Sequence, residues 1–216
     1  MNELILLLLR GLAVTVELTV VAAALAIIIA LSAGLARMSR RRAMAWSAAV
    51  YIEVFRGTSA LVQLFWFYFV LPFFGIEVSA FTAGTLVLAL NTGAYGAEVV
   101  RGAVLAVPRG QLDASAALNL NRLQTLWRIV LPQAFPAMLP PAGNLAIELM
   151  KNSALVSLIT ITELTFAAQL LRAETLRSAE IFGLVLVLYF AVALLITAGV
   201  RLLERRASHG LERGGA

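Results

Sequence analysis

Two oppositely charged side chains lie inside an apolar stretch and are the first candidates for chemistry. Glu148 and Lys151 are three residues apart, which places them on one face of a helix. A charge at the centre of a bilayer costs about 2.5–3.5 kcal/mol on insertion scales, so each needs a partner or water. A zwitterionic solute needs both a positive and a negative partner. The stretch therefore predicts a substrate path, together with polar residues on nearby turns: Asn144, Asn152 and Ser153.

The same pair also has a purely structural interpretation. Glu148 and Lys151 can neutralise each other and fix the packing of their helix, or Lys151 can lie near the cytoplasmic end of that helix. The sequence leaves the substrate path and the packing role open.

Polar side chains in other apolar segments form a second group of candidates. Asn91, Tyr95 and Glu98 fall at i, i+4 and i+7, so one face of their helix is polar, and Gln63 lies in the preceding apolar segment. These residues can line a cavity or form hydrogen bonds between helices. Glu98 can also pair with Arg101 at the membrane interface.

Residues suited to enzyme chemistry are scarce. The chain has no cysteine, which excludes disulfides, cysteine nucleophiles and thiolate metal sites. Its one histidine, His209, lies in a polar tail, and no H-E-x-x-H, G-x-S-x-G or G-x-x-x-x-G-K-[ST] motif occurs. We therefore expect the chain not to be an enzyme and not to hydrolyse ATP by itself.

Composition places the chain among integral membrane proteins. Hydrophobic residues make up 61% and charged residues 13% of 216 residues, with a mean hydropathy of +0.91. Soluble domains have about 45–50% apolar and about 25% charged residues. The length fits one domain, residues 1–216. The net charge of +5 comes from arginines beside apolar segments, so we expect a membrane surface and no nucleic acid as the partner of this charge.

The apolar segments predict an all-α protein with five transmembrane helices. A crossing needs about 20 apolar residues. A less apolar helix over 43–58, with Glu53 and Arg56, leads into the second crossing, and an outer segment of mixed charge covers 162–180. The expected spans are 11–36, 59–74, 80–99, 139–161 and 181–200.

Basic residues set the expected orientation. Arg37, Arg40, Arg41 and Arg42 follow the first span, and a basic tail that includes Arg213 follows the last. Because positive charge marks the cytoplasmic side, the N-terminus is expected outside and the C-terminus in the cytoplasm.

The segment 104–135 contains the longest stretch in the middle of the chain that cannot sit in a membrane. Asp113 to Leu118 favours a helix, with Asp113 expected in its first turn, where the helix dipole favours a negative charge. Asn119 is suited to a left-handed residue at the helix end. A second helix is expected over Arg122 to Val130, and four prolines stiffen the exit. The pattern predicts a helical corner that a partner can grip.

This corner resembles the EAA loop of the permeases of bacterial ABC importers. The family pattern is E-A-A, three residues, G, nine residues, and I-x-L-P. The chain departs from it at three positions, with Asp for Glu, Ser for the second Ala and Asn for Gly. The matching residues are Asp113, Ala114, Ser115, Asn119, Ile129, Leu131 and Pro132.

Further pieces narrow the resemblance to the polar amino acid uptake branch of these permeases. They occur in the order of that family and span most of the chain between residues 50 and 165. The pieces are EVFRGT (Glu53 to Thr58), LVQLFWFYF (Leu61 to Phe69), AYGAEVVRGA (Ala94 to Ala103), LPQA (Leu131 to Ala134) and LMKNSALVSLI (Leu149 to Ile159).

The resemblance implies a permease subunit in a bacterial cytoplasmic membrane. Its implied partners are two ATPase subunits that bind ATP and Mg, a second permease subunit and an extracytoplasmic solute-binding protein. The chain itself then binds no cofactor. Glu53 and Arg56 would pack near the cytoplasmic gate. The residues implied in ATPase coupling are those of the EAA match with Gly110, Gln111, Leu120 and Leu123, the two leucines forming an apolar knob.

Three hypotheses follow from the loop and its departures. One permease of a pair can carry the weaker EAA loop, so a heterodimer is favoured over a homodimer. The alternative function is an ion-coupled secondary carrier or channel without an ATPase, in which a long cytoplasmic corner has no obvious use. A membrane scaffold that only recruits an ATPase is a third interpretation. The imported solute is expected to be a polar amino acid or a related zwitterion.

Overall fold

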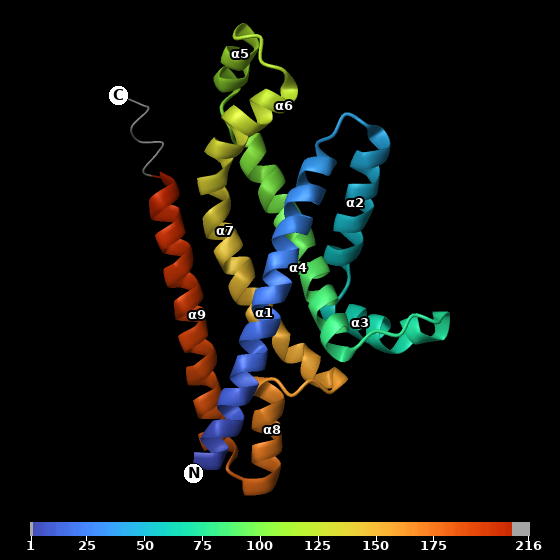
Figure 1. The fold of residues 1–216 in the computed structure, drawn as a ribbon, viewed down its shortest axis with the longest axis vertical. Coiled ribbons are helices and arrows are strands. Elements are labelled where there is room, and N and C mark those ends of the chain that lie inside the picture. The colour runs from blue at the N-terminus through green and yellow to red at the C-terminus, as the bar shows by residue number, and fades with distance from the viewer. Residues whose placement is uncertain (1, 209–216) are drawn as a thin grey trace.

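The computed structural model describes residues 2–208, with side chains described for 5–207, and is built from helices over that range (Figure 1). His209 and Arg213, named above, lie outside the described residues. The expected all-α class is confirmed in the part of the chain that the structure describes. The first helix, α1 (Asn2–Arg37), begins well before the span predicted over 11–36.

Helix α1 and helix α4 (Ala80–Leu105) form the central pair of the bundle (Figure 1). They approach closely because glycines face the partner helix. A Cβ atom added to Gly93 would lie 2.8 Å from the Ile29 side chain, and one added to Gly96 would lie 2.7 Å from Ala30 Cβ. Small residues allow such backbone approach in membranes, where packing rather than hydrophobic burial associates helices.

The second span predicted over 59–74 is not one straight crossing. Helix α2 (Arg42–Gly57) packs against α1 and α4, and the helical run Ala60–Phe74 turns away from it by 104°. That run contains a π-helix, whose wide turns carry most of the aromatic residues. Its three parts are α3 (Ala60–Phe65), η1 (Trp66–Val70) and η2 (Leu71–Phe74).

The helix that contains the fourth predicted span, 139–161, begins earlier than predicted, at Leu131. Helix α7 (Leu131–Asn152) runs through Pro136, Pro140 and Pro141 and continues as the 3-10 helix η4 (Ser153–Ile159). The segment 162–180, expected outside, contains α8 (Leu164–Thr175), which packs against α1 and α9 (Ser178–Ser208).

Two helical segments among the described residues, Ile5–Arg37 and Ser178–Ala207, are each long and apolar enough to cross a membrane. Two bent pairs would raise that number to four if each pair is one span: Arg42–Gly57 with Ala60–Phe74, and Arg122–Ile159 with Leu164–Thr175. Helix α4 is long but carries polar residues and glycines on its enclosed faces. The prediction of five spans and their orientation therefore stays a prediction.

Candidate functional site

The corner expected from the sequence is present at one end of the molecule (Figure 1). It consists of α5 (Arg109–Ala117), α6 (Arg122–Thr125) and the π-helix η3 (Leu126–Val130), between the ends of α4 and α7. Asn119 has φ 53°, which confirms the predicted left-handed residue. Asp113 is the fifth residue of α5, so the prediction that it lies in the first turn was wrong.

Local hydrogen bonds fix the shape of the corner. The Leu120 N–H donates to Ser115 O and the Asn119 N–H to Ala116 O, both at 3.0 Å, which is the pairing of a Schellman motif. The Asn121 side chain accepts from Gln124 N, and the Gln124 side chain accepts from Asn121 N, each at 2.9 Å. This capping box starts α6 directly after the turn.

Ser115 joins the two helices of the corner from inside. It is buried, its Oγ donates to Leu112 O at 2.7 Å, and it accepts from Thr125 Oγ1 at 3.2 Å. Ser115 occupies the position of the second Ala in the family pattern, and its hydroxyl forms hydrogen bonds inside the corner. Ser115 therefore stabilises the corner and presents little surface to a partner.

The corner exposes more large apolar side chains than the predicted knob contains. Leu123 is 65% exposed, as expected, whereas Leu120 is half-buried. Leu118 and Trp127 are 71% and 62% exposed, and the sequence analysis did not assign them to this surface. In the sequence, each of them is a large apolar side chain inside a polar segment, and this feature could have assigned them to the surface. Gly110, Gln111, Asp113, Ala114, Asn119 and Pro132 are also exposed, and Ile129 and Leu131 are half-buried.

The corner is attached to the bundle by an apolar cluster. Val107 and Val130 pack at its base with Val100 of α4 and Ala134 and Met138 of α7. In addition, the Gln133 side-chain amide donates to Gln111 Oε1 at 3.5 Å. A displacement of the corner would therefore be transmitted to α4 and α7.

Asn144, Glu148 and Lys151 lie on one exposed face of α7, at i, i+4 and i+7. No ion pair joins Glu148 and Lys151 in the described structure, so the self-neutralised pair is not formed. Lys151 is in the last turn of α7, at the end away from the corner. Asn152 is half-buried, and Ser153 is fully buried with its Oγ donating to Met150 O at 2.7 Å.

Gln63 and Asn91 hold the break between α2 and α3. The Gln63 amide donates to Phe55 O at 3.0 Å and to Thr58 O at 3.2 Å, and the Asn91 amide donates to Phe55 O at 2.9 Å. Both side chains are buried. Of the two roles considered above, the structure gives them interhelical hydrogen bonding at carbonyls that the 104° bend leaves without helical partners.

The remaining candidates form two separate contacts. Arg101 donates to Glu98 Oε2 from Nε at 2.9 Å, which confirms the expected pair. Glu53 makes no ion pair with Arg56 in the described structure. The Arg56 guanidinium instead lies 5.2 Å from the ring centroid of Tyr95, and the Tyr95 hydroxyl donates to Arg56 O at 3.4 Å.

One buried acid was missed by the sequence analysis, which placed it in the outer segment of mixed charge. Glu163 is 0% exposed and caps α8, accepting from Thr165 N and Phe166 N at 2.8 Å. The Tyr189 hydroxyl of α9 donates to it at 3.1 Å and the Thr15 hydroxyl of α1 at 3.4 Å. We name Glu163, Thr15, Thr165 and Tyr189 the Glu163 cluster.

An apolar helical bundle with a projecting capped corner and one polar helix face has the features of a membrane transport subunit that works with a partner. The model of the family "Binding-protein-dependent transport system inner membrane component" matches residues 10–209. The chain belongs to this family, which supplies the multi-pass membrane permeases of ABC importers.

Two relatives match nearly the whole chain. A probable amino-acid ABC transporter permease protein, y4tF of Sinorhizobium fredii (strain NBRC 101917 / NGR234), is 44% identical over 90% of this chain and 84% of its own length. The glutamine transport system permease protein GlnP of Escherichia coli (strain K12) is 39% identical over 93% of this chain and 92% of its own length.

Solved structures share the fold. A chain of a crystal structure of an amino acid ABC transporter with histidines superposes with a TM-score of 0.88 and 36% identity, covering 95% of this chain and 96% of its own. A chain of the inward-facing MetNI methionine ABC transporter superposes with a TM-score of 0.82 at 22% identity, covering 96% of this chain and 99% of its own, which shows the fold alone.

Proposed function

We propose that this chain is the membrane-spanning subunit of an ATP-driven importer of a polar amino acid or a related zwitterion. The observation that carries the proposal is the capped corner at 108–132, with its exposed apolar surface and its packing onto α4 and α7. The names of the aligned permeases refer to amino acids or to glutamine, which supports an amino acid as the solute.

The proposed assembly is a pair of permeases, two ATPases and an extracytoplasmic binding protein in the bacterial inner membrane. ATP and Mg would be bound by the ATPases alone. The proposed topology has five crossings: α1, the α2–η2 pair, α4, α7 with η4, and α9. The corner then faces the cytoplasm and α8 lies near the outer surface. The departures of the EAA loop favour a heterodimer.

The corner is proposed to enter a cleft of the ATPase, with Leu118, Leu123 and Trp127 as its apolar contacts. Closure of the ATPases would displace the corner, and Val107 and Val130 would pass that displacement to α4 and α7. The bundle would then move largely as a rigid body, because packed interfaces switch between discrete arrangements.

The polar face of α7 is proposed to line the solute path. Glu148 and Lys151 are exposed on this chain and are not paired with each other. In lipid such a face would be costly, so it must meet water or protein. A path shared with the second permease would supply both water and protein contacts. It would also present the Glu148 carboxylate and the Lys151 ammonium group to a zwitterion.

The test of coupling is ATPase activity of the reconstituted complex, with and without solute-loaded binding protein. For the native chain, we expect the binding protein to stimulate hydrolysis. Asp113→Arg reverses a charge on the exposed corner and should abolish the stimulation or release the ATPase. Uptake that collapses with an uncoupler while ATP is constant would instead establish the secondary carrier.

A second test addresses the polar face. Glu148→Ala and Lys151→Ala should each reduce uptake of labelled amino acid about tenfold or more while leaving ATPase binding intact, because a buried solute charge would lose its partner. Leu195→Ala, which shortens an exposed apolar residue of α9, is the control and should transport normally. Unchanged uptake in both charged variants would support the scaffold interpretation.

A further inference from the structure

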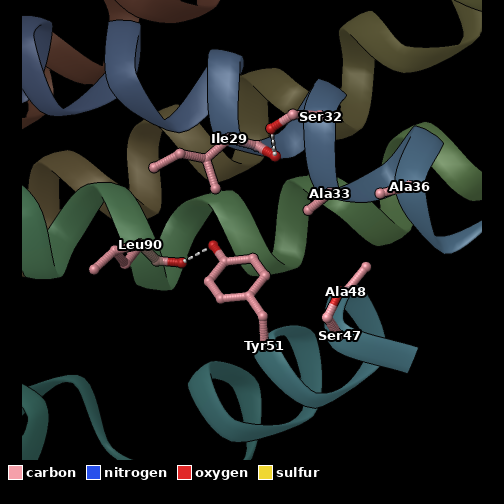
Figure 2. Close-up of a pocket in the computed structure, with 8 residues that line it drawn as sticks. All are labelled: Ile29, Ser32, Ala33, Ala36, Ser47, Ala48, Tyr51 and Leu90. Atoms are coloured by element: carbon pink, nitrogen blue, oxygen red, sulfur yellow. Dashed lines mark hydrogen bonds between the residues drawn. The ribbon is translucent and has the colours of Figure 1, made fainter. Parts of the chain in front are cut away.

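A cleft of about 380 Å³ lies between α1, α2 and α4, near the connection from α1 to α2 (Figure 2). Ser32, Ala33 and Ala36 of α1 form one wall, Ser47 and Tyr51 of α2 form the other, and Leu90 of α4 lies at the floor. Figure 1 shows α2 and α7 on opposite sides of the α1–α4 pair. The cleft is therefore separate from the polar face of α7.

The hydroxyl groups in this cleft are already satisfied by the protein. Ser32 Oγ donates to Ile28 O at 2.8 Å and Ser47 Oγ donates to Met44 O at 3.1 Å. The Tyr51 hydroxyl points across the floor and donates to Leu90 O at 2.6 Å (Figure 2). The walls consequently offer small apolar groups and little hydrogen bonding, which suits a hydrocarbon chain better than a polar solute.

The connection from α1 to α2, which adjoins the cleft in the sequence, is strongly basic. Arg37, Arg40, Arg41 and Arg42 are all exposed, and none of them forms an ion pair in the described part of the chain. Arg37 ends α1, directly after Ala36 of one wall. Arg42 begins α2, five residues before Ser47 of the other wall. The N-terminus of α2 has no side-chain cap and no acid in its first turn, so its N–H groups add to the positive field.

We propose that this cleft binds an anionic glycerophospholipid. One acyl chain lies between α1 and α2, and the headgroup phosphate lies over the four arginines and the start of α2. Basic clusters directly beside a transmembrane helix attract anionic lipid, and helix N-termini favour phosphate. Trp46, on the same part of α2, is 71% exposed, as expected for an aromatic residue at the level of the headgroups.

The experiment uses the fluorescence of Trp46 in the full-length chain reconstituted into vesicles. Trp66→Phe and Trp127→Phe leave Trp46 as the one tryptophan. Quenching by brominated phosphatidylglycerol is compared with quenching by brominated phosphatidylcholine at equal mole fractions, which gives the preference for anionic lipid. Symmetric vesicles make the result independent of the orientation of the chain. We expect a clear preference for phosphatidylglycerol.

Two charge variants test the headgroup site. Arg41→Gln/Arg42→Gln should lower the preference about fivefold for each arginine removed. Arg201→Gln/Arg206→Gln removes the same charge from exposed positions of α9 and should leave the preference unchanged. An equal loss in both variants would overturn the proposal, because it would mean a general surface-charge effect.

Two volume variants test the acyl-chain site. Ser47→Leu fills the cleft and should lower the preference, whereas Ala43→Leu, also on α2 but outside the cleft, should not. An equal preference in Ser47→Leu and Ala43→Leu would overturn the proposal. Insensitivity of native Trp46 to either brominated lipid would overturn it too, since protein would then cover this face.

Discussion

The corner at residues 108–132 and the Glu163 cluster both contain a helix cap, but their hydrogen bonds differ in range. Most hydrogen bonds of the corner join residues three to ten positions apart and leave its outer surface exposed. In the Glu163 cluster, partners 148 and 26 positions away converge on one fully buried carboxylate. The corner is proposed to contact another protein, whereas the cluster joins three helices of this chain.

This difference predicts where substitutions affect stability and where they affect coupling. A buried acceptor with four donors cannot be removed without leaving unpaired groups, so the cluster should dominate stability. The corner is exposed and locally capped, so changes there should act mostly on the partner.

The largest expected effect is that of Glu163→Ala. The change leaves two backbone N–H groups and the hydroxyls of Thr15 and Tyr189 without their acceptor. We expect the free energy of unfolding to fall by about 3 kcal/mol or more. Thermal or denaturant unfolding of the purified chain in detergent measures it. Glu174→Ala, at an exposed acid of α8, is the matched control and should change stability by less than about 0.5 kcal/mol.

An intermediate effect is expected for Asn119→Val. A β-branched side chain at φ 53° costs about 1–2 kcal/mol, and that cost should appear as lower stability of the corner. Asn119→Gly adopts the same conformation without strain and restores the residue of the family pattern, so its corner should be at least as stable. Amide hydrogen exchange at residues 114–125 reports the difference. Equal exchange in the two variants would show that the left-handed turn does not limit the corner.

The smallest effect on stability is expected for Asp113→Asn. Asp113 is exposed and no hydrogen bond of its side chain is found in the described structure, so the free energy of unfolding should change by less than about 0.5 kcal/mol. Stimulation of the ATPase by the binding protein should nevertheless weaken, because Asp113 lies on the surface proposed to contact the ATPase. A loss of stability like that of Glu163→Ala would remove the distinction between the two regions.

Two groups of polar side chains depend on contacts between helices. The sequence left Gln63 and Asn91 open between a solute path and hydrogen bonding between helices, and in the structure both side chains donate to the Phe55 carbonyl near the end of α2. Glu163 stood among exposed charges of an outer segment, with no local sign that Tyr189 would reach it. Asn91 and Phe55 are 36 positions apart, and Glu163 and Tyr189 are 26 positions apart, so the spacing of residues carries no information about these two partners.

The sequence by itself determined the membrane class, the capped corner and its left-handed Asn119, because apolar composition, turn propensity and capping depend on residues within one or two turns of each other. Tertiary structure alone decided the break after α2, the exposed surface of Leu118 and Trp127, and the burial of Glu163. These features depend on which helices meet. Packing sets the approach of α1 and α4 across Gly93 and Gly96. Packing and the cost of an unpaired buried polar group set the contacts of α8 with α1 and α9.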